Sequence, residues 1–448
     1  MPQYKIKFVS FLLIFAAFCL SFSAASAQSI IRDAEIESRL RIISNPIFSA
    51  AGLNPSQVRI IIIGDDQINA FVAGGQNMFL YTGLLLETKN VGQLVGVIAH
   101  ESGHIAGGHL MRMRDAAERA SLESIVATVL GLAVGLGAGD ASAGAATVMG
   151  GSEFAARRML KHSRVLESSA DQAGMAALER AGYSSRDMAD FLEFLSSQEV
   201  LPEMQRSSYV LTHPLSRERL QTVQNFVARS RNADKPFPAA WQEYFSRIQA
   251  KTLAFTKPYQ ALRRYTDDSF AARYGRTIAL YRTGKVNDAL TLLSALEKEE
   301  PENGFLAELR GQILFEQGRI DESITAYRRA ITREPKQGLM HLSLAQALLQ
   351  NEKNNPQQAI EHLIIARENG ERDTPFLYRW LATAYGRQGK DGLAKLALAE
   401  EALLQGDMNF AVLQATRAEE GLKNDNASRQ RARDIINIAN RRLSNNKK

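Results

Sequence analysis

The chain has 448 residues, with 54 Lys and Arg against 48 Asp and Glu and a formal net charge of +6 at pH 7. This length exceeds one ordinary domain and predicts two or three, while the mild positive charge without dense basic clusters favours no DNA or RNA partner. The single cysteine, Cys19, excludes a disulfide framework and a metal site built on thiolates.

The N-terminus has the pattern of a secretory signal over residues 1–27. Lys5 and Lys7 precede an apolar stretch at 8–22, and small residues at 25–27 form a cleavage site. An uncleaved membrane anchor is the alternative, although the apolar stretch is short for one. We therefore expect an exported protein whose formal charge, without the two lysines, falls from +6 to +4.

The first predicted element of the remaining chain is a helix over residues 30–45. Ile36, Leu40 and Ile43 follow one another at helical spacing and would form its buried face. Pro46 should end or kink this helix, because proline lacks the backbone donor that a helix interior needs.

Three short strands should follow. Residues 58–63 are rich in β-branched side chains, and the segments 70–72 and 78–81 are separated by a turn at the glycine pair 74–75. An unpaired edge of such a sheet can align an extended polypeptide through backbone hydrogen bonds. The sheet therefore favours recognition of unfolded polypeptides with little dependence on their sequence.

The most informative motif lies in a predicted helix over residues 91–110. His100 and His104 are four residues apart and share one helical face, and Glu101 stands beside them. Zinc binds neutral imidazole nitrogens at about 2.0–2.1 Å, and a neighbouring carboxylate can take a proton from bound water. The motif predicts a zinc site in which Glu101 is the general base.

His109 is the first candidate for a third ligand, but its spacing does not fit. In the related pattern with three histidines the last one would fall at Leu110, one residue later. We expect His109 to support the site from outside the ligand set.

An apolar segment rich in Gly and Ala covers residues 125–151 and is interrupted by Asp140. We favour a lid or plug over the site that can also touch a membrane surface. A transmembrane hairpin and an ordinary buried helical hairpin are the alternatives.

Two carboxylates further along the chain complete the candidate site. Glu167 and Asp171 are four residues apart in a segment of helical character. One of them can bind zinc while the other accepts the second ring N–H of a ligand histidine. Two histidines followed by a glutamate are the arrangement of a gluzincin peptidase.

Four motifs follow one another through the first half of the chain. They are Asn69-Ala70-Phe71, then His100 to His104, then Ser163-Arg164 with Glu167, Ala170 and Asp171, then Thr212-His213-Pro214 with Arg219. In this order they resemble the HtpX- and BepA-like zinc metallopeptidases over roughly residues 30 to 225. The resemblance implies that His100, His104 and Glu167 bind zinc, Glu101 is the base and Asp171 supports a ligand.

The resemblance also assigns residues around these ligands. His213 would lie in a loop near the metal, either as an extra ligand or as a group that stabilises the reacting carbonyl. Arg219 would hold that region in place, and the segment of Asn69, Ala70 and Phe71 would contact the substrate.

The second half of the chain contains a repeat. Gly284 and Gly318 lie 34 residues apart, as do Pro301 and Pro335, and small residues recur where helices would cross. This period resembles tetratricopeptide repeats, which form a concave surface for binding proteins. Generic helical hairpins are the alternative.

These observations predict a predominantly α protein: an α+β gluzincin domain with a small sheet beside the zinc helix, followed by an α-solenoid. We expect a signal peptide at 1–27, a peptidase domain at 28–230, a linker and connecting helix at 231–264 and repeats at 265–448.

By resemblance, the chain would be a zinc endopeptidase of the bacterial periplasm that acts on misfolded or stalled outer-membrane proteins. The repeats would dock on the outer-membrane protein assembly machinery, and peripheral contact with the outer membrane is left open. The alternative is a chaperone or adaptor for outer-membrane protein assembly in which proteolysis is secondary.

Overall fold

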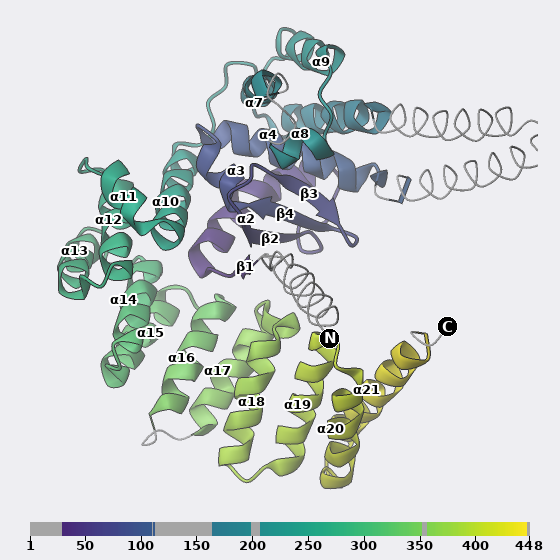
Figure 1. Ribbon diagram of the computed structural model, residues 1–448, viewed down its shortest axis with the longest axis vertical. Helices are drawn as coiled ribbons and strands as arrows, with labels where there is room; N and C mark the ends of the chain where they lie inside the picture. Colours follow the sequence, from purple (N-terminus) through teal and green to yellow (C-terminus); the bar gives the residue numbers. More distant parts are fainter. Residues whose placement is uncertain (1–28, 110, 113–163, 199–206, 352–355, 446–448) are drawn as a thin grey trace, which may run out of the picture.

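The computed structural model describes residues 29–109, 111–112, 164–198, 207–351 and 356–445 (Figure 1). A small sheet with helices around it forms the N-terminal part, and an array of helices forms the rest, which confirms the predominantly α fold. The predicted signal segment and the segment 125–151 lie outside the described residues. Among those described, no helix is long and apolar enough to cross a membrane.

The sheet has four strands in the order β1-β2-β4-β3. They are β1 (Ser29–Ile31), β2 (Arg59–Gly64), β3 (Ala70–Ala73) and β4 (Asn77–Tyr81). β2 runs parallel to β4, whereas β1 and β3 are antiparallel to their neighbours. The three predicted strands are present, β1 is an addition, and β1 and β3 are the two edges of the sheet.

Helix α2 (Ala34–Ala50) buries the predicted apolar face. The helix does not end at Pro46, which was one of the two outcomes that we expected, because it continues through that residue for another turn. Ile47 and Phe48 in that turn are fully buried. Their burial outweighs the one backbone hydrogen bond that proline cannot make.

Helix α4 (Val91–Ala106) follows the short helix α3 (Thr82–Glu87) and carries the histidine motif. The side chain of Asn90 caps its N-terminus. The helix is shorter than predicted because Gly108 adopts a left-handed conformation, with φ at 60°, directly after it.

The helix of residues 164–181 crosses α4 at close range. A Cβ atom at Gly103 would lie 2.5 Å from the carbonyl oxygen of Ala170, and one at Gly174 would lie 2.9 Å from the backbone of Ala99. Larger side chains at these two glycines would therefore push the helices apart. The approach brings Glu167 and Asp171 to the histidines of α4.

Among the described residues, the predicted peptidase part also contains α7 (Arg186–Gln198), α8 (Ser208–Thr212) and α9 (Arg217–Val227). Helix α10 (Ala239–Thr256) lies in the segment that we predicted to be a linker and connecting helix. Its Trp241, Phe245 and Ile248 belong to the same hydrophobic core as α2, α4 and the sheet. The helix is therefore structural support for the peptidase part, and a truncation near Arg231 would remove part of that core.

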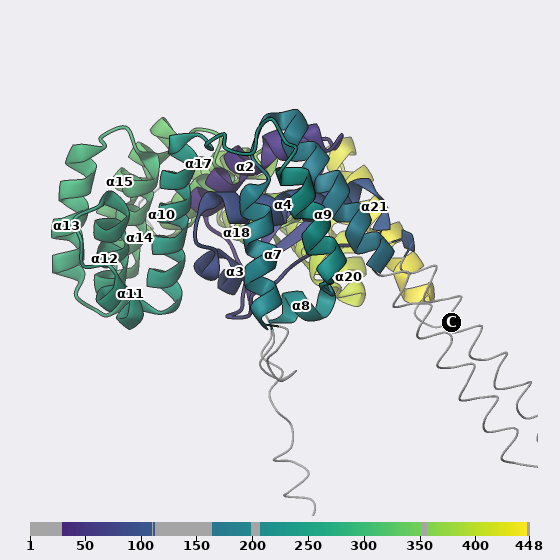
Figure 2. The same ribbon diagram turned by 90° about the horizontal axis from the view of Figure 1, so that it is seen from above.

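The remaining helices form hairpins that follow an arc around the peptidase part (Figures 1 and 2). They are α11 (Pro258–Arg264), α12 (Phe270–Arg282), α13 (Val286–Glu299), α14 (Gly304–Glu316), α15 (Ile320–Arg333), α16 (Gly338–Gln350), α17 (Pro356–Glu368), α18 (Pro375–Arg387), α19 (Asp391–Gln405), α20 (Met408–Gly421) and α21 (Asn426–Asn445). The predicted period has a structural cause. Gly284 and Gly318 both have positive φ and turn the chain after α12 and α14.

The arc folds back on the peptidase part. Arg32, next to β1, pairs with Glu371 at 2.7 Å, and Arg59 at the start of β2 pairs with Asp373 at 3.1 Å. The turn between α17 and α18 therefore touches the sheet, although more than 300 residues separate the partners in the sequence.

Candidate metal centre

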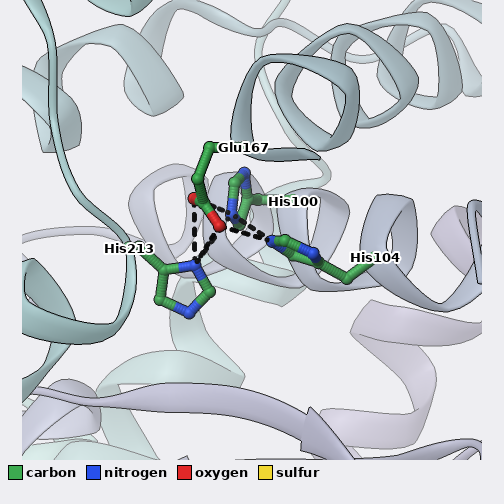
Figure 3. Close-up of side chains that lie close together, drawn as sticks. All are labelled: His100, His104, Glu167 and His213. Atoms are coloured by element: carbon green, nitrogen blue, oxygen red, sulfur yellow. Dashed lines mark hydrogen bonds and ion pairs between the residues drawn. The ribbon is translucent and has the colours of Figure 1, made fainter. Parts of the chain in front are cut away.

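Four side chains from three segments meet beside the sheet (Figure 3). His100 and His104 come from α4, Glu167 from the helix of residues 164–181, and His213 from the residue after α8. All four are buried, and one potential ligand atom from each lies within 4.8 Å of the others. Helix packing thus brings together the three ligands that we predicted, together with His213.

The distances between these atoms fit a single metal ion. His100 Nε2 is 3.0 Å from His104 Nε2, and the Glu167 oxygens are 3.4 and 3.3 Å from the same two nitrogens. His213 Nδ1 is 3.3 Å from His100 Nε2 and 3.1 Å from Glu167 Oε2. Ligands at about 2.0–2.1 Å from a tetrahedral zinc are separated by about 3.4 Å. The four residues therefore fit a metal ion with ligand distances like those of zinc.

Glu101 lies next to this cluster and is fully buried. Within the described part of the chain, both of its carboxylate oxygens lack a hydrogen-bond partner, and Oε1 is 3.5 Å from His213 Nε2. A buried carboxylate without a hydrogen bond is costly and indicates a function. Its position suits a base that receives a proton from a water molecule held at the metal.

Asp171 and Arg219 contact the predicted ligands and hold them in position. Asp171 Oδ1 is 2.8 Å from His100 Nδ1, so it fixes that ring with Nε2 turned to the ligand cluster. Arg219 donates to Asp171 through Nε at 2.6 Å, and its Nη1 is 3.1 Å from Glu167 Oε2. Arg219 is therefore an internal support of both carboxylates, which the sequence alone could not distinguish from a surface arginine.

The electrostatics of the metal-free cluster follow from these contacts. Burial disfavours a charged His100, but the hydrogen bonds of Asp171 and Glu167 raise its pKa to about 10. Burial also opposes ionisation of Glu167, yet His213 and the bonded His100 and His104 hold its pKa far below the usual range. Burial lowers the pKa of His104. The cluster therefore holds positive charge between its carboxylates, and a metal cation would take that place.

His109 contacts a ligand and lies outside the ligand set. Its Nδ1 is 3.1 Å from His104 Nδ1, on the side of that ring opposite the cluster. Burial lowers the pKa of His109 to about 4, so its ring is neutral. This placement fits the supporting role that its spacing predicted.

The predicted substrate segment lies beside His213. His213 Nε2 donates to the carbonyl oxygen of Ala70 at 3.3 Å, while Asn69 is buried one residue earlier. The ring of Phe71 stacks on Phe79 with centroids 4.7 Å apart and meets the edge of Tyr81. Neither of these two neighbours is a predicted metal ligand. Ala70 thus contacts the centre through its carbonyl oxygen.

Tyr209 is a member of the site that sequence reasoning missed. Its ring stacks on His213 with centroids 4.5 Å apart, and burial raises the pKa of its hydroxyl well above the usual value. The available signal was its spacing, four residues before His213 on one helical turn.

The comparisons with known proteins agree with this geometry. Residues 32–227 match the model of peptidase family M48, and residues 311–352 match a tetratricopeptide repeat. The beta-barrel assembly-enhancing protease of Yersinia pestis is 27% identical over 401 residues, which cover 86% of this chain and 80% of that protein.

Other relatives share smaller parts. The protein of the same name in Escherichia coli O157:H7 is 30% identical over 314 residues, 66% of this chain and 61% of that protein. The metalloprotease YcaL of Escherichia coli K12 is 27% identical over 180 residues, 39% of this chain and 65% of that protein.

The fold and the site together define a metallopeptidase joined to helical repeats. Residues 32–227 match peptidase family M48, and tetratricopeptide repeats follow that part of the chain. A metallopeptidase part followed by these repeats makes the chain a BepA-like metalloendopeptidase.

Proposed function

We propose that the metal is zinc, held by His100, His104 and Glu167, and that the protein cleaves unfolded or misfolded outer-membrane proteins in the periplasm. The observation that carries the proposal is the buried carboxylate of Glu101, which has no hydrogen bond to a described residue and lies beside four clustered ligand atoms. The donor set of two imidazoles and one carboxylate is that of a catalytic zinc site.

Zinc in this position supplies Lewis acidity, which polarises the scissile carbonyl and makes water a stronger acid. Glu101 removes the proton from the attacking water and gives it to the leaving amine. Asp171 keeps His100 in the required tautomer, and Arg219 keeps Asp171 and Glu167 ionised and in place.

Strand β3 is the proposed substrate edge. The N–H of Tyr81 donates to Asn69 O at 3.1 Å, so these two residues form a hydrogen-bonded pair. In an antiparallel ladder, hydrogen-bonded pairs alternate with pairs that have no hydrogen bond between them. Ala70 and Leu80, which lie opposite each other, are thus a pair without hydrogen bonds between them. The N–H and C=O of Ala70 therefore point away from β4. An extended substrate can add there as a further strand through backbone bonds, which suits unfolded chains.

His213 would close the centre by taking the fourth position at the metal. Its Nε2 donates to the carbonyl oxygen of Ala70, and its Nδ1 lies toward the other ligand atoms. The N–H of Tyr209 also donates to Ile68 at 3.0 Å, so α8 lies against the substrate segment. Opening requires this short helix to leave the edge.

Replacement of His213 should therefore activate the enzyme. We expect His213→Ala to retain zinc and to cleave an unfolded protein, or the chain itself, faster than the unsubstituted protein, because the fourth position becomes free for water. Initial rates and metal content of both proteins check this. A fall of tenfold or more with zinc still bound would instead assign His213 to stabilising the reacting carbonyl.

The substrate class and the partner rest on the repeats and on the relatives. Relatives over most of the chain are named for the enhancement of β-barrel assembly, and a tetratricopeptide array is a scaffold for binding proteins. The repeats would dock on the assembly machinery of the outer membrane and so bring the peptidase to stalled substrates.

The test of the substrate class uses one outer-membrane β-barrel in two states. We expect the urea-unfolded barrel, diluted into buffer, to be cleaved at least about tenfold faster than the same barrel folded in detergent, because only the unfolded chain can add to β3. Fragment yields on a gel give both rates. Equal rates for the two states would contradict the proposed substrate class.

A further inference from the structure

A cavity of about 520 Å³ lies between the peptidase part and the repeats, apart from the metal centre. One wall is formed by residues at the edge strand β1, the start of α2 and helix α10. The facing wall is formed by α14, α15 and α16. Both halves of the protein are therefore needed to enclose it.

Most charges near this cavity are already paired. Lys251 of α10 lies 2.9 Å from Asp33 and 3.2 Å from Glu35, and Glu35 also accepts a hydrogen bond from Tyr274 at 2.7 Å. Arg32 in the wall pairs with Glu371 and with Glu37. These pairs leave no spare positive charge among them.

Glu308 of α14 is the exception. Its half-buried side chain lines the cavity, and in the part of the chain that the structure describes it has neither an ion pair nor a hydrogen bond. The hydroxyl of Thr252 in the other wall is buried and has no hydrogen-bond partner among the described residues. A carboxylate that lines a cavity and has no ion-pair partner among the described residues can receive a cation there.

We propose that this cavity binds a lysine or arginine side chain of an extended polypeptide, with Glu308 as the carboxylate that receives the cation. Phe255 and Phe315 in the walls would cover the aliphatic part of such a side chain. The amides of Gln312 and Gln346 can bond to the backbone of the same polypeptide.

A polypeptide fits better than a free amine because the cavity is larger than one side chain and has apolar as well as polar walls. It also lies against β1, a strand at the edge of the sheet. The site is independent of the zinc centre and would hold a polypeptide at the junction of the two parts.

Ionisation of Glu308 should make binding at this site depend on pH. Burial raises the pKa of Glu308 to about 8, with Asp33 and Glu35 adding to the rise and Lys251 opposing it. The other charged or titratable groups around the cavity are Arg32, Glu37, Tyr274, Glu316 and Tyr327. A bound cation favours the ionised carboxylate, so binding releases a proton, and affinity should rise with pH up to about 8 and then level off.

The test measures binding without cleavage. The full chain with Glu101→Gln is titrated separately into two labelled, unstructured peptides with blocked termini. The two peptides differ at one position, which is lysine in one and norleucine in the other. We expect the lysine peptide to bind at least about tenfold more tightly, as a charge-assisted hydrogen bond allows. Glu308→Gln should abolish this difference, whereas Glu361→Gln, an exposed glutamate outside the cavity, should keep it.

A second variant keeps the proposal testable in case Glu308→Gln does not fold. Ser343→Phe fills the cavity from α16 without changing a charge and should abolish binding of the lysine peptide as well. Equal affinity for both peptides, or a lysine preference that survives Glu308→Gln, overturns the proposal. Spermidine that binds at Glu308 more tightly than the lysine peptide overturns the assignment to a polypeptide. None of these outcomes bears on zinc or on cleavage.

Discussion

Glu101→Gln should lower hydrolysis of an unfolded protein at least about a hundredfold while zinc remains bound. The amide keeps the size of the side chain but cannot take a proton from water. Zinc should stay because its proposed ligands, His100, His104 and Glu167, are unchanged. The measurement is the initial rate of cleavage together with the metal content of the purified protein.

The same variant separates the two functional readings. If the protein acts chiefly as a chaperone or adaptor, Glu101→Gln should still support assembly of outer-membrane proteins in cells that lack the native protein. Loss of that support along with cleavage would assign the role to proteolysis. Cleavage close to the unsubstituted rate would contradict the assignment of Glu101 as the base.

Glu167→Ala should reduce zinc binding more than any other change outside α4. Its carboxylate touches both ligand histidines and Arg219, so its loss removes a ligand and leaves the charge of Arg219 without one of its partners. Dialysis against a zinc buffer, followed by metal analysis, gives the affinity.

Two substitutions at neighbouring residues serve as comparisons for the loss of zinc binding in Glu167→Ala. Asp171→Ala should weaken zinc binding about 10–100-fold, because Asp171 only orients His100. His109→Ala should have a smaller effect, since His109 contacts His104 on the side away from the cluster. A greater loss of zinc in His109→Ala than in Glu167→Ala would refute the proposed ligand set.

The parts of the fold that could be predicted are those with local signals. The apolar period of α2, the β-branched run of β2 and the repeated glycines after α12 and α14 act over a few residues or recur at a fixed period. Pro46 shows the limit of such reasoning, because the burial of the next two residues overrides a local rule.

The site divides in the same way. The spacing of His100 and His104 fixes their geometry on one helix, so the sequence is sufficient there. The burial of Arg219 against Asp171 depends on two helices that meet 48 residues apart in the chain. The cavity at Glu308 depends on contacts between the two halves, and no local pattern indicates it.

The central claim is that His100, His104 and Glu167 hold a zinc ion that cleavage requires. Its most direct test is to strip the protein of metal with a chelator, remove the chelator and titrate zinc back while following cleavage of an unfolded protein. We predict no cleavage without metal and a rise that ends at one zinc per chain, with no such rise in Glu167→Ala. Cleavage that persists in the metal-free protein would contradict the claim.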